Sequence, residues 1–526
     1  MTAHPALGLQ EEAIAFLGDP RSHGGQAVER IDTHAALVFL AGDRALKLKR
    51  AVRYPYLDYS TVEKRRAACV AELAINRRTA PALYRGVVAI RRGDDGRLRL
   101  DEGAGNASGP ASSDASRDVI DWLVSMARFP DEALFDRMAE RQALTPALMR
   151  RLAERIAAFH REAAPRPEEG GVEAMRAVAD GNFVDLHAAA DLFPAEKVAR
   201  LAERTGAALD RLAPLLEERR RAGFVRHGHG DLHLRNIVLL DGEPALFDAI
   251  EFDEALAVTD VFYDLAFLLM DLDHRGLRPL GNAVLNRYLE ETEDYGGLAA
   301  LPLFLSLRAA VRAKVSAAAL RLGGRRGEKT AVLADEARRY LGHALAALDP
   351  APARLVAVGG LSGSGKTRLA HGIAPDLGPA PGAVVLRSDV LRKRLCGVAD
   401  TDRLPAGGYA PAVTERVYAE LYRRAAAVLA AGHAVVIDAV SARPDERRRI
   451  EAVAAEAGLR FDGIWMEAPL VERVARVTNR RSDASDATAD VVERQESYDL
   501  GTIGWTRLDS GRVASDVLDD ARASLA

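Results

Sequence analysis

The chain has 526 residues, of which 48% are hydrophobic and 28% charged, and its formal net charge at pH 7 is −4. This length exceeds one ordinary core, so we expect more than one domain, and the composition is globular rather than disordered. The slightly acidic balance argues against nucleic acid or an anionic membrane as the main partner.

The cysteine content and the apolar runs indicate the cellular compartment and the absence of a membrane span. The chain has only two cysteines, Cys69 and Cys396, which excludes a disulfide framework and favours a reducing cytoplasm. The first residues lack a basic region followed by an apolar core, and the apolar runs are too short to span a bilayer. We therefore expect a cytoplasmic protein with no signal peptide and no membrane partner.

The first predicted elements are a β-hairpin over residues 36–50 and a helix after it. On the second strand of the hairpin, Lys47 and Lys49 alternate with leucines, so both lysines share one face. A capping-box pattern at residues 60–63 opens the helix, which carries Glu72. By themselves these charges fit a solvated strand face and helix surface as well as they fit a site.

Further strands are expected at residues 86–92, 97–100 and 119–126. The intervening residues 101–118 are rich in Gly, Ser, Ala and Asp and indicate a flexible surface insertion. Helical periodicity dominates from Thr145 onward.

A dense polar motif occupies residues 229–236, His-Gly-Asp-Leu-His-Leu-Arg-Asn. Its spacing matches the kinase catalytic loop H-x-D-x-x-x-x-N, with a second aspartate downstream. Phosphoryl transfer needs one carboxylate beside the attacking hydroxyl, and an amide oxygen and another carboxylate to hold Mg²⁺. Asp231 fits the first role, and Asn236 and Asp248 fit the second. A hairpin over residues 237–247, turning at an Asp-Gly pair, would return Asp248 to the side of Asn236.

This stretch resembles the aminoglycoside phosphotransferase family, whose motif reads H-G-D-x-H-x-x-N and is followed by an I/F-D segment. The resemblance implies an α+β, protein-kinase-like domain with a small β lobe and a helical lobe. It implies that a strand lysine and Glu72 position the ATP phosphates, and that the backbone near Met126 meets adenine. We favour Lys47 over Lys49 because residues 45–47 resemble the kinase A-I-K pattern, although the sequence leaves the choice open.

Two further polar residues of this half are expected to be structural. Asp264 lies in a D-L-A segment that the family shares, where it would be a buried support of the catalytic loop. His160 is expected to be a packed histidine at a helix end. Helices complete a first domain over residues 1–348, and the proline-rich linker 349–353 follows. We expect the two sides of this linker to fold independently.

Past the linker, a buried-type strand at 354–358 leads into a glycine-rich loop and a helix at 368–374. The loop is a complete G-x-x-x-x-G-K-[ST] in the strand–loop–helix context that this motif requires. Its glycines let backbone N–H groups wrap a phosphate, and its last residue can also bind Mg²⁺. The expected nucleotide contacts are Gly360, Ser362, Gly363, Ser364, Gly365, Lys366 and Thr367.

Strands at 383–386, 434–438 and 464–466 then predict the parallel sheet of an α/β P-loop domain over residues 354–526. Ligands of such sheets bind beyond the carboxyl ends of the strands, which places Asp389 beside an acceptor hydroxyl.

Three more side chains complete the predicted second site. Asp438 ends a strand as a Walker-B-like metal ligand, although such an aspartate can also merely cap the next turn. Arg476 and Arg480 suit a lid that closes on the ATP phosphates, although a solvated helix face explains either one equally well.

Residues 483–488 and Gln495 resemble the lid segment of P-loop kinases in the zeta-toxin and gluconate-kinase group. The two resemblances together match a family of predicted bacterial bifunctional proteins, in which an aminoglycoside-phosphotransferase-like domain is fused to a P-loop kinase domain. They imply ATP and Mg²⁺ as cofactors and small-molecule hydroxyl acceptors as substrates. The alternative is that the P-loop half is a nucleotide-controlled switch acting on the first half. Asp389 separates the two hypotheses, because a switch needs no acceptor base.

Overall fold

The structure is a computed structural model that describes residues 5–33, 35–54, 57–102, 118–322, 328–400, 402–479 and 484–526. In space the chain divides into two compact units, Met1–Ala174 with Glu217–Leu268, and Met175–Leu216 with Leu269–Ala526. Neither unit is one continuous stretch of sequence. The linker at 349–353 as a domain boundary stays a prediction, since the spatial division falls elsewhere.

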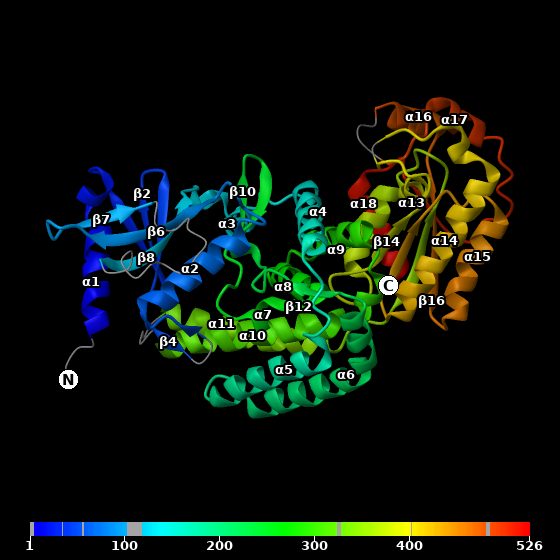
Figure 1. Ribbon diagram of the computed structural model, residues 1–526. Coiled ribbons are helices and arrows are strands. Elements are labelled where there is room, and N and C mark those ends of the chain that lie inside the picture. The colour runs from blue at the N-terminus through cyan, green and yellow to red at the C-terminus, as the bar shows by residue number, and fades with distance from the viewer. Residues whose placement is uncertain are drawn as a thin grey trace. The chain divides into compact units, whose positions relative to one another are not determined.

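The first unit contains a six-stranded sheet in the order β1-β2-β3-β8-β6-β7, in which every pair of neighbours is antiparallel (Figure 1). The expected hairpin is present as β2 and β3, with Lys47 opposite Val38. The strands are β1 (Val28–Asp32), β2 (Ala36–Ala41), β3 (Arg44–Lys49), β6 (Tyr84–Arg92), β7 (Leu98–Asp101) and β8 (Val119–Ala127), and the short pair β4 (Arg53–Tyr54) and β5 (Leu57–Asp58) lies outside this sheet.

A helix covers each face of this sheet. Leu37 of β2 and Leu46 and Leu48 of β3 pack with α1 (Pro5–Gly18) on one face. Ala45 and Val124 pack with α2 (Val62–Asn76) on the other. Because side chains alternate along a strand, Lys47 and Lys49 lie on the α2 face.

The start of α2 differs from the sequence-based prediction. Thr61 is the N-cap, and its side-chain oxygen accepts a hydrogen bond from the Lys64 backbone N–H at 3.3 Å. The Ser60 hydroxyl instead donates to Asp58 at 2.5 Å. The capping box expected to begin at Ser60 is therefore wrong, because that side chain already has a partner outside the helix.

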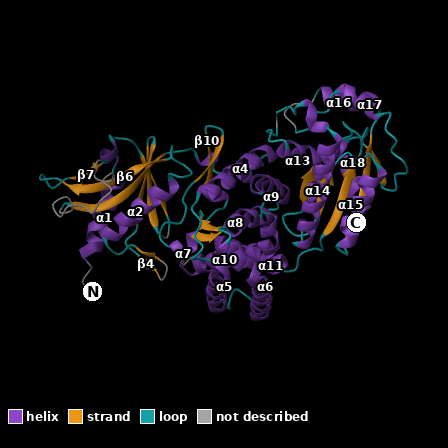
Figure 2. Ribbon diagram, turned by 45° about the vertical axis from the view of Figure 1, so that its right-hand side comes forward, coloured by secondary structure: helices purple, strands orange, loops and turns teal. Residues whose placement is uncertain are grey.

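The helical part of the kinase-like region follows β8, and α10 and α11 pack along each other (Figure 2). Among the described residues, no helix is both long and apolar enough to cross a membrane. The helices are α3 (Phe135–Glu140), α4 (Pro146–Glu162), α5 (Gly171–Ala188), α6 (Ala195–Arg221), α7 (Glu254–Ala257), α8 (Val261–His274), α9 (Arg278–Thr292), α10 (Leu301–Leu322) and α11 (Glu328–Ala347), with the 3₁₀ helix η4 (Tyr295–Ala300). Two antiparallel strand pairs join β9 (Val225–His227) with β12 (Val258–Asp260), and β10 (Ile237–Leu240) with β11 (Glu243–Leu246).

The second unit contains the predicted parallel sheet, with five strands in the order β14-β15-β13-β16-β17. The strands are β13 (Arg354–Gly359), β14 (Val384–Arg387), β15 (Val435–Asp438), β16 (Arg460–Glu467) and β17 (Thr506–Asp509), the last of which the sequence did not predict. Besides helices already named, the helices that follow β13 in this unit are α12 (Lys366–Ile373), α13 (Ser388–Leu395), α14 (Pro411–Ala430), α15 (Pro444–Glu456), α16 (Leu470–Thr478), α17 (Ala489–Gln495) and α18 (Ala514–Leu525).

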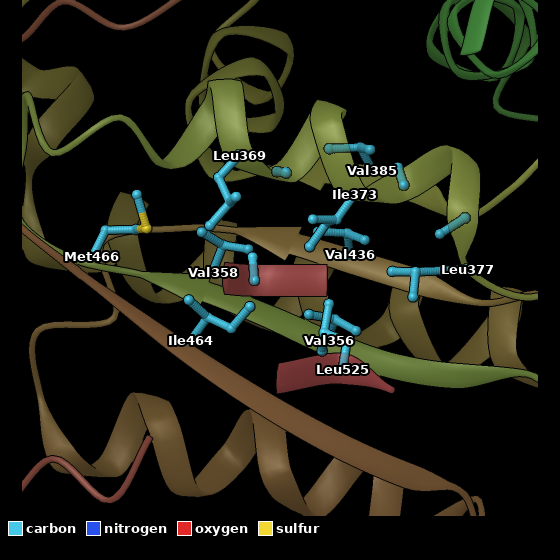
Figure 3. Close-up of a cluster of buried hydrophobic side chains, with 14 of the residues drawn as sticks. Val356, Val358, Leu369, Ile373, Leu377, Val385, Val436, Ile464, Met466 and Leu525 are labelled. Atoms are coloured by element: carbon cyan, nitrogen blue, oxygen red, sulfur yellow. The ribbon is translucent and has the colours of Figure 1, made fainter. Parts of the chain in front are cut away.

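The core of this sheet fixes the glycine-rich loop. Leu369 and Ile373 reach from α12 toward Val358 and Val436 on the strands (Figure 3). All four side chains are buried. The packing of α12 against β13 and β15 therefore holds both ends of the loop that connects β13 to α12.

Candidate active sites

The first site is organised around Lys47, which ion pairs join to two acids from distant parts of the chain. Its ammonium lies 2.8 Å from Glu72 Oε1 and also contacts Asp248. Burial by itself would lower the pKa of Lys47, but the negative charges of Asp248 and then Glu72 outweigh burial and raise it. The lysine is therefore held charged between the helix α2 and the segment after β11, as the kinase-like resemblance implies.

Lys49 forms a second, deeper ion pair on the same strand face. Its ammonium contacts the other oxygen of Glu72 and also Glu251, which accepts a hydrogen bond from Tyr59 Oη at 2.7 Å. Burial lowers the pKa of Lys49, but Glu72 and Glu251 raise it well above its ordinary value. Sequence reasoning missed Glu251 and Tyr59. The available signal was a charged residue, Glu251, set in an otherwise apolar run after Asp248.

The catalytic loop places Asp231 beside Asn236. Asn236 Nδ2 donates to the backbone oxygen and to Oδ2 of Asp231, both at 2.9 Å. His233 Nε2 lies 3.3 Å from the same carboxylate oxygen. The Asp231 side chain is 38% exposed, so the loop holds this carboxylate in a fixed orientation while leaving it accessible.

Asp264 supports this loop from beneath, as expected. Its carboxylate is fully buried and accepts hydrogen bonds from the backbone N–H of His229 at 2.8 Å and of Gly230 at 2.9 Å. His160 Nε2 lies 3.1 Å from it, which places that histidine in the support rather than at the reacting centre. A Cβ at position 228 would lie 2.7 Å from Asp264 Oδ2, so only glycine allows the carboxylate to approach this closely.

The predicted hairpin returns Asp248 to Asn236. β10 and β11 pair directly, and the Phe247 N–H donates to the Asn236 backbone oxygen at 3.0 Å. Asp248 has a left-handed backbone, with φ of +60°, and its N–H donates to Tyr84 Oη at 3.1 Å. One carboxylate and one amide on adjacent backbone fit Mg²⁺, which proteins usually bind through one or two carboxylates together with substrate phosphates.

Met126 lies near the end of β8, opposite Ala45 and Tyr84, and is buried. Its strand leaves the sheet immediately afterwards, where β8 ends at Ala127. The expected contact of this backbone with adenine stays a prediction.

In the second unit, the glycine-rich loop has the conformation that its motif predicts. α12 begins at Lys366, directly after Gly365, which has a φ of +86°. The Ser362 N–H donates to Gln495 Oε1 at 2.7 Å, and Lys366 Nζ donates to the Leu361 backbone oxygen at 3.1 Å. A Cβ at Gly363 would lie 2.6 Å from the backbone oxygen of Arg473, so α16 packs against the loop through this glycine.

The two predicted metal ligands of this unit are in contact. Thr367 Oγ1 donates to Asp438 Oδ2 at 2.6 Å, and Arg387 Nε lies 3.4 Å from the same oxygen. A hydroxyl and a carboxylate at the end of adjacent elements are hard oxygen donors, which suit Mg²⁺ at a phosphate loop. The remaining loop residues, Gly360 and Ser364, are buried in the turn before α12.

Asp389 lies in the first turn of α13, directly after β14, and is partly buried. The pKa of Asp389 is raised, first by desolvation and then by the nearby charge of Asp438. A hydrogen bond from Ser485 and the positive charges of Arg387 and Lys366 lower this pKa, but by less. A base works best when its pKa approaches the working pH, so this shift favours a role in proton transfer.

Of the two arginines predicted to form a lid, only Arg476 lies among the described residues. Arg476 donates to the Ser510 backbone oxygen at 2.6 Å and approaches the Gly363 oxygen at 3.4 Å, which places it beside the phosphate loop. Arg480 lies outside the described residues. Arg473 was not predicted, yet it pairs with Glu496 and joins α16 to the end of α17.

Comparisons with known proteins agree with the two kinds of domain that the sequence resembles. The phosphotransferase enzyme family matches residues 99–301, and an AAA domain matches residues 355–498. Two proteins described as uncharacterized, from Mycobacterium tuberculosis and Mycobacterium bovis, are each 31% identical to this chain over 482 residues, or 89% of this chain and 90% of theirs. The chain belongs to the family of these mycobacterial proteins. It joins an aminoglycoside-phosphotransferase-like domain to a P-loop kinase domain, and with two kinase-type domains it is a phosphotransferase.

Solved structures show similarity to each part. A choline/ethanolamine kinase family protein from Mesorhizobium loti is 15% identical with a TM-score of 0.39, covering 65% of this chain and 99% of that one. The APS kinase of Mycobacterium tuberculosis is 23% identical with a TM-score of 0.26, covering 33% of this chain and 98% of that one.

Proposed function

We propose that each domain transfers the γ-phosphate of ATP to a hydroxyl group of a small molecule. For the first domain, the observation that carries this proposal is the position of Lys47, charged and bound to both Glu72 and Asp248. In kinase-type sites such a lysine, fixed by a helix glutamate, contacts the phosphates next to the metal-binding aspartate. The geometry therefore supports Lys47 rather than Lys49 as the phosphate contact, because Lys49 is directed toward Glu251 and Tyr59 instead.

In the first site, Asp231 would orient an acceptor hydroxyl and take its proton. Asn236 supports this role by holding the Asp231 carboxylate at 2.9 Å. Asn236 and Asp248 would hold Mg²⁺, which when bound neutralises charge on the phosphate oxygens. Lys47 would then exchange part of its contact with Asp248 for the phosphates, while Glu72 keeps its ammonium in place.

In the second site, the backbone of the loop and Lys366 would hold the phosphates, and Thr367 and Asp438 would hold Mg²⁺. Asp389 would accept the proton of the acceptor hydroxyl. Its position after β14, together with its raised pKa, supports transfer over a pure switch, since a switch has no use for a base at that point.

A screen on the full chain tests this proposal. Hydroxyl metabolites would be offered with ATP to the native protein, to Asp231→Asn and to Asp389→Asn, and phosphorylated products would be measured by mass. Each substitution should abolish one set of products and leave the other. If neither substitution changes any product while ATP still binds, the assignment of both bases is refuted. If the second domain makes no product and ATP binding at the P-loop changes the rate of the first domain, the switch hypothesis replaces the proposal that the second domain is a kinase.

A further inference from the structure

The strand that leads to Asp389 lies at an edge of the parallel sheet. β14 occupies the first place in the sheet order and pairs with β15. The Val384 N–H donates toward that neighbour, to the Ala434 backbone oxygen at 2.9 Å. Backbone groups alternate in direction along a strand, so the polar groups of Ala383 and Val385 point away from the sheet and need partners elsewhere.

Helix α9, which sequence analysis assigned to the first domain, supplies partners for the Val385 N–H and the Ala383 oxygen, while the Ala383 N–H donates to the Ala374 oxygen at 2.7 Å. Asn286 Oδ1 accepts from the Val385 N–H at 2.7 Å, and Asn286 Nδ2 donates to the Ala383 oxygen at 3.2 Å. Asn282 Nδ2 donates to the same oxygen at 3.0 Å. Both asparagines are buried. A side-chain carboxamide has the same donor and acceptor as a peptide group, so Asn286 takes the place of a further strand.

Charged groups around the end of α9 extend this attachment to the elements after β14. Glu293 Oε1 accepts from Arg424 Nη2 on α14 at 2.7 Å and lies 3.5 Å from Arg394 Nη1 on α13. Arg287 Nη1, within α9, donates to Asp400 Oδ2 at 2.8 Å, in the segment that follows α13. Together, α9 and Glu293 therefore contact β14, the helix α13 that carries Asp389, and Asp400 in the segment after α13.

We propose that α9 is a positioning element for the acceptor side of the P-loop site, with Asn286 as its central residue. By pairing with β14 and, through Glu293, with α13, the helix and its end fix the strand-to-helix turn on which Asp389 lies. This inference rests on the proposed function, in which Asp389 activates the acceptor. The phosphate loop is held separately, by α12 packing on the sheet core. Loss of Asn286 therefore affects transfer rather than nucleotide binding.

The test uses the full chain with Asp231→Asn, so that ATP turnover reports the second site. In this background, Asn286→Leu keeps the branching and the number of side-chain heavy atoms but removes the hydrogen bonds to the Val385 N–H and the Ala383 oxygen. We expect hydrogen exchange at the Val385 amide to accelerate about tenfold or more. ATP turnover, with water or an acceptor, should fall about tenfold, the usual effect of losing a hydrogen bond that positions a catalytic group. In a titration that resolves the two ATP sites, the dissociation constant of the second site should change less than about twofold, since the loop keeps its contacts.

Two further variants guard against a folding artefact. Thr292→Val removes the hydrogen bond from Thr292 Oγ1 to the Tyr288 oxygen and the long one, at 3.4 Å, that Thr292 Oγ1 accepts from the Asp294 N–H; because neither bond reaches β14 or α13, exchange and turnover should stay unchanged. Glu293→Gln weakens the pairs with Arg424 and Arg394 at a half-exposed side chain, so it should fold normally and lower turnover in the same direction as Asn286→Leu.

Different results would refute the positioning role of α9 and the role of Asp389 as the base. Unchanged exchange at Val385, or faster exchange with unchanged turnover, would overturn the positioning role of α9. A weakened ATP affinity equal to the loss of turnover would overturn it too, because the helix would then act on the whole domain. If Asp389→Asn alone leaves turnover unchanged, the proposed base fails, and the exchange data still decide whether α9 holds the strand.

Discussion

The two nucleotide sites are built in opposite ways. The phosphate loop of the second site is one contiguous stretch, Gly360–Thr367, fixed by the strand and helix at its ends. The first site brings Lys47 into contact with residues 25 and 201 positions away, Glu72 and Asp248. A contiguous site depends on local backbone, whereas a dispersed site depends on the packing of whole elements. Substitutions in the ion pairs of the first site should therefore cost stability, whereas substitutions in the phosphate loop of the second site should weaken binding with little loss of stability.

The largest expected effect is at the base of the first site. Asp231→Asn should lower its turnover by about 10²–10⁴-fold, because the amide cannot take the hydroxyl proton. ATP binding should remain, since the carboxylate is not placed among the phosphate contacts. Asn236→Ala and Asp248→Ala should instead weaken Mg-ATP binding. Titration calorimetry and initial rates measure the two effects, and loss of ATP binding in Asp231→Asn would reverse these roles.

The paired lysines test the dispersed site directly. Lys49→Met leaves Glu251 buried without its cation and should destabilise the fold by about 3–5 kcal/mol, the usual cost of breaking a buried ion pair. Lys47→Met should cost less stability, because Glu72 keeps Lys49 and Asp248 is partly exposed, but it should weaken ATP binding.

Denaturant unfolding and ATP titration of both variants measure this difference. Lys49→Met combined with Glu251→Leu should recover part of the lost stability, because no unpaired carboxylate remains at that position. If Lys49→Met weakens ATP binding more than Lys47→Met at equal stability, then Lys49 is the phosphate contact.

The contiguous site should respond without loss of stability. Lys366→Ala should weaken ATP binding at the second site by about 10–100-fold, which corresponds to the loss of a hydrogen bond to a charged group. The unfolding midpoint of the nucleotide-free protein should change little, because Lys366 is partly exposed and its ammonium bonds a loop oxygen. A large loss of stability would contradict the contrast between the sites.

The smallest expected effect is a shift of a pH profile. Asp389 must be ionised to take a proton, and its pKa is raised, so transfer by the second site should fall as pH decreases through that raised value. The acid limb should therefore lie above the usual pKa of an aspartate, about 3.9. Ser485→Ala removes a hydrogen bond that lowers the pKa and should move the limb to still higher pH. A limb at or below about 3.9 would contradict the role of Asp389.

The parts of both sites that the sequence predicted are those with local patterns. The hairpin between Asn236 and Asp248 was predicted because an Asp-Gly turn and alternating strands fix its geometry within a few residues. Glu251 and Tyr59 were missed, since their contact with Lys49 arises only when β3, α2 and the segment after β11 pack together. The role of α9 was missed for the same reason. Its one signal is that Asn282 and Asn286, four residues apart, interrupt the apolar face of the helix.

The asparagines of α9 also have a consequence for the solubility of partial chains. A fragment that begins at the linker, near Pro350, would lack this helix and would present the Ala383 oxygen and the Val385 N–H without partners at an open sheet edge. Open edges of this kind pair with strands of other molecules and promote aggregation. We therefore expect the isolated P-loop fragment to self-associate in proportion to its concentration, and a fragment that begins before Arg278 to stay monomeric. In the full chain, α9 binds these groups of the edge strand, so we expect that strand not to act as a template for assembly.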